Sequence, residues 1–210
     1  MYNFSRVKIF MSEKFRDLQI DNTPKISHKS INRQVPDNGE HIILDDSGNI
    51  KERNFYVKGK KNGESRVYKN GLLIQRKTYK DDVLEGFVEI YSNGNLQMLT
   101  KYSGNFPNGI GYFFHNTGII NAIAYYKNGL LDGLFLVFNE QGFIIKRQFY
   151  KDNLLNGPTV TYHENGEICE TGNYKDNLQE GQWTTKDPTG KLRQTAIFQG
   201  GICTAKKTEK

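Results

Sequence analysis

The chain has 210 residues and a formal net charge of +6, and only 36% of its residues are hydrophobic. No segment approaches the roughly 20 consecutive apolar residues that cross a bilayer as a helix. The charge does not indicate nucleic-acid binding, because residues 36–205 hold 19 basic and 19 acidic residues. The excess therefore lies at the two ends of the chain and forms no basic stripe along a docking face.

Residues 1–35 form a basic, non-repetitive N-terminal segment. The apolar side chains that recur there at near-helical spacing are Phe4, Val7, Met11, Phe15 and Leu18. They predict an amphipathic helix over residues 3–20. The segment lacks the apolar run of a signal peptide, and the two cysteines, Cys169 and Cys203, belong to no metal or redox spacing, so we expect a cytoplasmic protein with unpaired thiols.

From residue 39 onward the chain repeats. Glycines recur every 23 or 24 residues, at Gly48, Gly71, Gly94, Gly118, Gly142, Gly166 and Gly190. An aromatic ring stands eight residues after each of them, from Tyr56 to Phe198, and a second glycine follows each of the first six rings after seven residues, from Gly63 to Gly181. A fixed period of this length indicates a stack of small units that bury their apolar sides against their neighbours. We predict a repeat domain over residues 36–205 and a basic tail over residues 206–210.

Each unit is predicted to be a β-hairpin. The aliphatic residue two positions after the first glycine, such as Leu73, and the ring six positions later, Tyr79, have the same parity, so a strand places both side chains on one face. The connection that follows is rich in Asp, Asn and Gly, which adopt left-handed conformations, and an Asn-Gly turn leads into the next unit. Six or seven hairpins predict an elongated, single-layer antiparallel sheet of about thirteen strands, hence an all-β fold.

The repeated pattern Gly-x-x-x-x-Tyr-x-x-Asn-Gly-x-Leu, followed by Tyr-Lys-Asp/Asn-x-x-x-x-Gly, resembles the variant MORN repeat of bacterial proteins. The resemblance is clearest in residues 85–109 and 156–181. It implies a β-hairpin array. It also implies an antitoxin or immunity protein with a cognate toxin or effector as its partner, because proteins built from these repeats are often described as antitoxins.

No pattern typical of catalysis occurs in the sequence. The four histidines are scattered without metal-ligand spacing: His28, His41, His115 and His163. We expect them to be solvated residues of turns. Asp and Glu gather in turns, where bonds to the local backbone explain them, and nucleophile and phosphate-binding motifs are absent. We expect a protein that is not an enzyme and has no metal or cofactor. A lectin or carbohydrate-active enzyme using the aromatic sheet is the less favoured alternative.

The middle units differ from the outer ones. Strand positions outside the repeat signature are mainly polar in the outer units, whereas both faces are apolar over residues 110–138. A strand that is apolar on both sides is covered on both sides. Three covers remain open: the N-terminal helix, a protein partner or second copy, and a membrane surface that the basic N-terminal segment approaches. A membrane-surface scaffold is therefore the alternative to a protein-binding module.

The predicted partner-binding residues comprise apolar anchors and acidic turn residues. The anchors are Tyr112, Phe135, Leu136 and Trp183, and the acidic residues that would face a basic partner are Asp81, Asp82 and Asp132. Trp183 also fits another role, because terminal repeats need atypical caps and its ring suits a plug at the C-terminal end of the array. The sequence leaves these two roles open.

Overall fold

The computed structural model describes residues 35–209, and this part of the chain is all-β. The strands form an antiparallel sheet in chain order from β1 to β10 and from β12 to β16, with the short β11 pairing with β10 beside this series. The sixteen strands confirm the predicted array of hairpins and exceed the expected number. The chain divides into two compact units between Gly109 and Ile110, within β7 (Phe106–Phe114).

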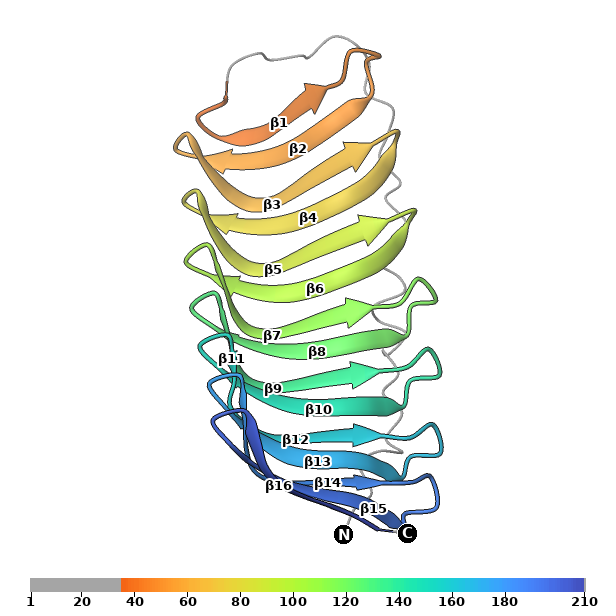
Figure 1. Ribbon diagram of the computed structural model, residues 1–210. Coiled ribbons are helices and arrows are strands. Elements are labelled where there is room, and N and C mark those ends of the chain that lie inside the picture. Colours follow the sequence, from red (N-terminus) through yellow and green to blue (C-terminus); the bar gives the residue numbers. More distant parts are fainter. Residues whose placement is uncertain (1–34, 210) are drawn as a thin grey trace. The chain divides into compact units, whose positions relative to one another are not determined.

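The strands before β7 pair in hairpins joined by two kinds of turn. They are β1 (Gly39–Leu44), β2 (Ile50–Val57), β3 (Lys60–Lys69), β4 (Leu72–Lys80), β5 (Val83–Ser92) and β6 (Asn95–Ser103). The two kinds of turn lie at opposite ends of the strands, one on each side of the sheet (Figure 1). Asp81 and Asp82 occupy one turn with φ angles of 51° and 68°. The prediction that Asp and Asn supply left-handed turn residues is confirmed.

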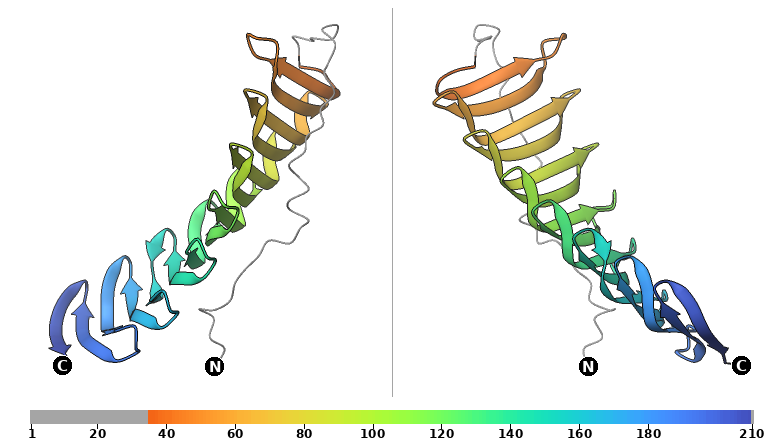
Figure 2. Two further views of the ribbon diagram at one scale, coloured as in Figure 1. Left: turned by 90° about the vertical axis from the view of Figure 1, so that its right-hand side faces the viewer. Right: turned by 60° about the vertical axis from the view of Figure 1, so that its left-hand side comes forward.

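The strands after β7 repeat this arrangement. They are β8 (Ile120–Lys127), β9 (Leu130–Phe138), β10 (Ile144–Lys151), β11 (Leu154–Leu155), β12 (Gly157–Tyr162), β13 (Ile168–Lys175), β14 (Leu178–Lys186), β15 (Leu192–Gln199) and β16 (Ile202–Thr208). Figure 2 shows these hairpins, coloured green to blue, in chain order from two further sides. The last strand runs through Lys206 and Lys207, which the sequence placed in a tail.

Turn side chains link each hairpin to the preceding one. The Oδ1 atom of Asn177 accepts a hydrogen bond from the backbone N–H of Leu155 at 2.7 Å. Asn153 binds Leu131, and Asp82 binds Lys61, in the same way and at the same distance. The residue at this turn position therefore needs both a left-handed backbone and a short side-chain acceptor, which explains why Asp and Asn recur there.

The second glycine combines positive φ with close packing in every unit but the last, where Gly181 has no atom within 4 Å of its Cβ position. Gly133 has a φ angle of 119°, a region that side chains rarely tolerate. A Cβ atom at this position would lie 3.3 Å from the Cβ of Tyr125 in the preceding strand. At Gly133 the missing side chain thus leaves room for Tyr125, the residue before the first-strand ring, to pack against the next strand.

A β-bulge reverses the side-chain alternation near the start of each unit. Leu73 lies opposite Tyr68, whereas Gln75 lies opposite Val67, so β4 contains one extra residue between them. Tyr68 and Val67 are adjacent and point to opposite faces, and Leu73 and Gln75 therefore do so as well. The prediction that Leu73 and Tyr79 share a face is wrong, because the bulge lies between them.

Both faces of β8 are buried at its centre. Ile123 and Ala124 are neighbours with exposed fractions of 5% and 0%, so the strand is covered on both sides, as its sequence predicted. The expectation that the histidines are solvated turn residues is wrong for His41, which is 8% exposed and lies in β1, and for His115 and His163, which are half-buried. The Nε2 atoms of His115 and His163 lie 3.2 Å from the carbonyl oxygen of Phe138 and 2.9 Å from that of Lys186, so each of these two rings links its turn to the next unit.

The helix predicted over residues 3–20 lies outside the described residues. Among residues 35–209 no helix is long and apolar enough to cross a membrane. Over the same range no group of three or more His, Cys, Asp or Glu residues is placed to hold a metal ion. The Cys169 and Cys203 thiols are both free.

Candidate protein-binding surface

One row of side chains changes character along strands β8 to β15. Residues directly opposite each other in antiparallel strands share a face. Successive partners in this row are Ile123, Leu136, Arg147, Val160, Thr171, Thr184 and Thr195. Up to Val160 the row is apolar apart from Arg147, and beyond it the residues are threonines. The Thr171 and Thr184 hydroxyls pair at 2.7 Å, so these two side chains satisfy each other within the chain.

Flanking positions enlarge the apolar part of this row. Tyr125 follows Ile123 by two residues in β8, and Leu134 lies opposite Phe149, so these side chains share the face. Tyr112 holds the repeat position that Leu136 holds in the next unit. We call the following set the apolar face: Tyr112, Tyr125, Leu134, Leu136, Phe149 and Val160. The side chain of Tyr125 is 41% exposed and the others are half-buried.

Arg147 is the one charged residue in the row from Ile123 to Val160. Its guanidinium carbon lies over the ring of Phe149, 5.3 Å from the centroid. Within residues 35–209, no carboxylate forms an ion pair with it. A half-buried arginine on an aromatic ring, without a counter-charge, can offer its N–H groups to a partner molecule.

The corresponding row in residues 35–109 is charged and paired in its middle part and apolar at both ends. Its successive members are Ile42, Arg53, Arg66, Arg76, Glu89 and the buried Leu99. The Nη2 atom of Arg76 lies 2.6 Å from Oε1 of Glu89, and the hydroxyl of Tyr91 donates to the same carboxylate. Burial alone lowers the pKa of Arg76, but the hydrogen bond and charge of Glu89 outweigh it and raise this pKa above its ordinary value. This row leaves little unpaired charge or apolar surface.

The repeat units were also compared with known families and proteins. The family model described as the MORN repeat variant matches residues 155–176 and 179–199, which are two successive units. These two units are therefore similar in sequence to MORN repeats. No curated protein matches the sequence. MORN repeats serve in general as protein-binding or membrane-binding modules.

The predicted anchors lie on two different faces of the sheet. Tyr112 and Leu136 belong to the apolar face. Phe135 is adjacent to Leu136 in β9, so its side chain points to the opposite face. It pairs with Ala124 and packs edge-on against Tyr150, with ring centroids 5.6 Å apart. A partner on one face therefore cannot contact both Leu136 and Phe135.

Trp183 lies in the second of the two matched units and is buried. It is only 4% exposed and packs edge-on between Tyr174 and Phe198, with centroid separations of 5.1 and 6.0 Å. Its ring covers Gly172, where an added Cβ atom would lie 2.1 Å from Cδ2 of the indole. This packing favours the role of a plug in the terminal repeat units, because the ring offers a partner almost no surface.

The three predicted acidic residues are dispersed. Asp81 and Asp82 form a turn in residues 35–109, where Oδ1 of Asp82 accepts from Lys61 N–H and Oδ1 of Asp81 accepts from the Asn62 side chain. Asp132 is half-buried in β9, in the same compact unit as the apolar face. The structure therefore brings only Asp132 into the unit that carries Tyr112 and Leu136.

Sequence reasoning missed five members of the candidate surface, which lie in β8, β9, β10 and β12: Tyr125, Leu134, Arg147, Phe149 and Val160. Their places in the repeat are regular. Each precedes a first-strand ring by one or three residues, or follows a second glycine by one or three residues. Reading these positions as one face requires the register of the strands, which the bulges alter.

Proposed function

We propose that this protein is a protein-binding module whose apolar face docks on a partner protein. The observation that carries the proposal is the contrast within one row of side chains. Apart from Arg147, the row is apolar from Ile123 to Val160 and then changes to threonines, of which Thr171 and Thr184 are hydrogen-bonded to each other. A solvent-exposed row in repeated units needs no such change, whereas a surface that buries against a partner does.

The composition of the apolar face suits an interface centre. Binding energy concentrates in Tyr, Trp and Arg residues that lie among side chains excluding water. Tyr112, Tyr125 and Arg147 supply these residue types, and Leu134 and Leu136 supply the apolar surroundings. Arg147 contributes most if a carboxylate or backbone carbonyl of the partner reaches its guanidinium group.

The finer proposal is an antitoxin or immunity protein whose partner is a toxin. It is supported by the resemblance to variant MORN repeats and by the general role of these repeats as binding modules. In this mechanism the apolar face covers the toxin's active site or a surface next to it. Co-expression of the protein would then protect cells from its partner, and a surface variant that no longer binds would not protect them.

The test compares two substitutions at equivalent repeat positions. Leu134 and Gln182 each follow a second glycine directly and occupy β9 and β14. Leu134→Asp places a charge in the apolar face, and Gln182→Asp places the same charge outside it. The protein is used as bait in its native cell extract, and the captured partner is then purified and titrated against both variants.

We expect one stoichiometric partner whose affinity falls at least 100-fold with Leu134→Asp and less than three-fold with Gln182→Asp, because a buried unpaired carboxylate costs several kcal/mol. Equal affinities for both variants would refute the apolar face as the interface.

A version lacking residues 1–34 distinguishes the protein-binding module from the membrane-surface scaffold. Lost binding to anionic vesicles with retained protein binding assigns any membrane contact to that segment.

A further inference from the structure

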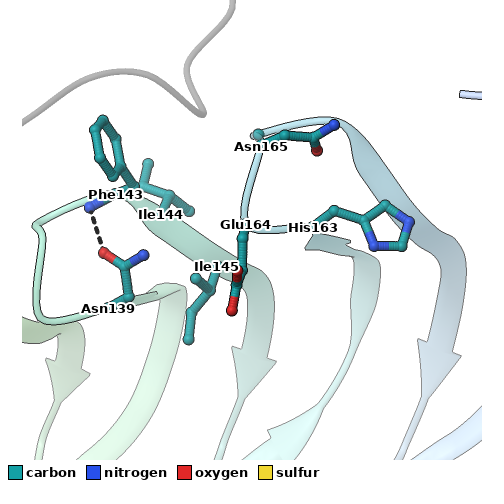
Figure 3. A pocket seen from close by; sticks show the side chains of 8 residues that line it. Asn139, Phe143, Ile144, Ile145, His163, Glu164 and Asn165 are labelled. Carbon is teal, nitrogen blue, oxygen red and sulfur yellow. Dashed lines mark hydrogen bonds between the residues drawn. The ribbon is translucent and has the colours of Figure 1, made fainter. Parts of the chain in front are cut away.

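A small cavity lies at the turn end of β10, outside the apolar face. It has a volume of about 310 Å³ and lies between the turn at residues 139–143 and the turn at residues 163–167. Phe143, Ile144 and Ile145 form its apolar wall, and Glu164 contributes a carboxylate (Figure 3). A volume near the lower end of the range for ligand sites, about 300–1,000 Å³, suits one side chain better than a cofactor.

Most polar side chains around this cavity hold the turns in place. Oδ1 of Asn139 accepts hydrogen bonds from the N–H groups of Gln141 and Phe143, at 3.1 and 2.9 Å. The Asn165 side chain donates to the carbonyl of Pro188 and accepts from the N–H of Glu167. His163 binds the carbonyl of Lys186, and Figure 3 shows its ring directed away from Ile145. These groups are therefore engaged in the repeat framework.

Glu164 differs from them because its carboxylate has no hydrogen bond or ion pair to any described residue. Figure 3 shows this carboxylate beside the side chain of Ile145. The ring of Phe143 at the rim is 37% exposed. The cavity thus combines a free negative charge, aliphatic side chains and an accessible aromatic ring.

We propose that this cavity binds an arginine side chain of a protein partner. The aliphatic stem of arginine would pack on Ile144 and Ile145, and its planar guanidinium group would donate two hydrogen bonds to Glu164. The ring of Phe143 favours a guanidinium group over an ammonium group, because guanidinium is planar, less strongly hydrated and stacks on aromatic faces.

The neighbouring pairs of turns lack this combination of an aromatic ring, aliphatic side chains and a free carboxylate. The preceding pair of turns carries Ile119 and Asn121 where the cavity has Phe143 and Ile145. The following pair carries Glu167, Cys169 and Pro188 where the cavity has Phe143, Ile145 and Glu164. The framework of the turn repeats, whereas the aromatic ring, the aliphatic wall and the free carboxylate come together only once among the three intervals between residues 115 and 193.

The experiment titrates the full-length protein with N-acetyl-arginine N-methylamide and follows backbone amide resonances by NMR. We expect saturable shifts confined to residues 139–145 and 163–167, with a millimolar dissociation constant typical of a single side chain. The Glu164→Gln variant should bind about ten-fold more weakly, since one charge-assisted contact is lost. The matched control is Glu167→Gln in the same turn, which should bind as the unchanged protein does.

Neutral and ammonium probes complete the test. The citrulline analogue should bind at least ten-fold more weakly than the arginine probe, and the lysine analogue should bind several-fold more weakly. Equal binding of the citrulline or lysine probe, or unchanged binding by Glu164→Gln, would overturn the proposal. The Leu134→Asp variant should bind the arginine probe normally, so failure at this cavity is distinguishable from failure at the apolar face.

Discussion

Substitution of Gly172 provides a direct test of how the terminal units are packed. The indole of Trp183 lies over this glycine, and an added Cβ atom would be 2.1 Å from Cδ2 and 2.2 Å from Cε2. The φ angle of Gly172 is not in the left-handed region, so the backbone itself tolerates alanine. Any loss of stability in Gly172→Ala must therefore come from displacement of the Trp183 ring.

Two opposing effects determine how much Gly172→Ala changes the free energy of unfolding. Replacing a strand glycine with alanine stabilises by about 0.5–1 kcal/mol where space allows. Overpacking a filled core costs about 1–3 kcal/mol, and here the ring cannot move without losing its contacts with Tyr174 and Phe198. We expect Gly172→Ala to lower the free energy of unfolding by about 1–3 kcal/mol.

A double-mutant cycle isolates this contact. Trp183→Thr introduces the residue that Thr159 provides at the same repeat position, and in this background Gly172→Ala should become neutral or stabilising. Urea unfolding of all four proteins, followed by far-UV circular dichroism, should give a coupling energy of about 2–3 kcal/mol. An equal loss in both backgrounds would show that Trp183 does not occupy the space above Gly172.

Three further predictions concern the framework of turns and ion pairs. Asn177→Gly should lower the free energy of unfolding in urea by about 0.5–1.5 kcal/mol, because only the side-chain hydrogen bond to Leu155 is lost. Asn177→Ala should lower it by about 1–2 kcal/mol more, because alanine also disfavours the φ angle of 68°. Equal losses for the two variants would contradict the account of this turn. Glu89→Gln should lower stability by about 1–3 kcal/mol, because it removes the closer of the two carboxylates that pair with the half-buried Arg76 and leaves only Glu64, at 3.7 Å. Glu40→Gln at the more exposed Arg53 pair should cost less than about 1 kcal/mol. Hydrogen bonds from the Thr189 hydroxyl, then Arg193 and backbone N–H groups, hold the pKa of Asp187 below its ordinary value, so the stability it contributes is present above about pH 4 and is lost as the pH falls further. The difference in melting temperature between the unchanged protein and Asp187→Asn should therefore be constant from pH 8 to 5 and shrink in more acidic solution, and a constant difference down to pH 2 would contradict this assignment.

The regular part of the fold could be predicted from the sequence because the same residue types recur in every unit. The period of the glycines and rings predicts the hairpins, and Asp and Asn at 81–82 and 152–153 predict the left-handed turns. The faces could not be assigned in the same way. A bulge inserts one residue between Leu73 and Gln75, and this single insertion reverses the alternation on which the parity argument depended.

The candidate site was predictable only in part for a related reason. The apolar character of residues 110–138 is visible in the sequence and led to Tyr112 and Leu136. Arg147 and Phe149 lie in a mixed polar stretch, and only the pairing of β9 with β10 places them beside Leu136 and Leu134. Trp183 could not be assigned from composition, because its burial depends on the absence of a side chain at Gly172 in the neighbouring strand.

Site-specific photo-crosslinking in the native cells tests the central claim most directly. A photoreactive phenylalanine analogue replaces Leu136 in the apolar face, and in a matched protein it replaces Thr184, which holds the same repeat position in β14. We predict that the probe at position 136 gives one discrete adduct with another protein and that the probe at position 184 gives none. Adducts of equal yield at both positions, or at position 136 only a crosslink to residues 1–34 of the same chain, would contradict the apolar face as a protein-binding surface.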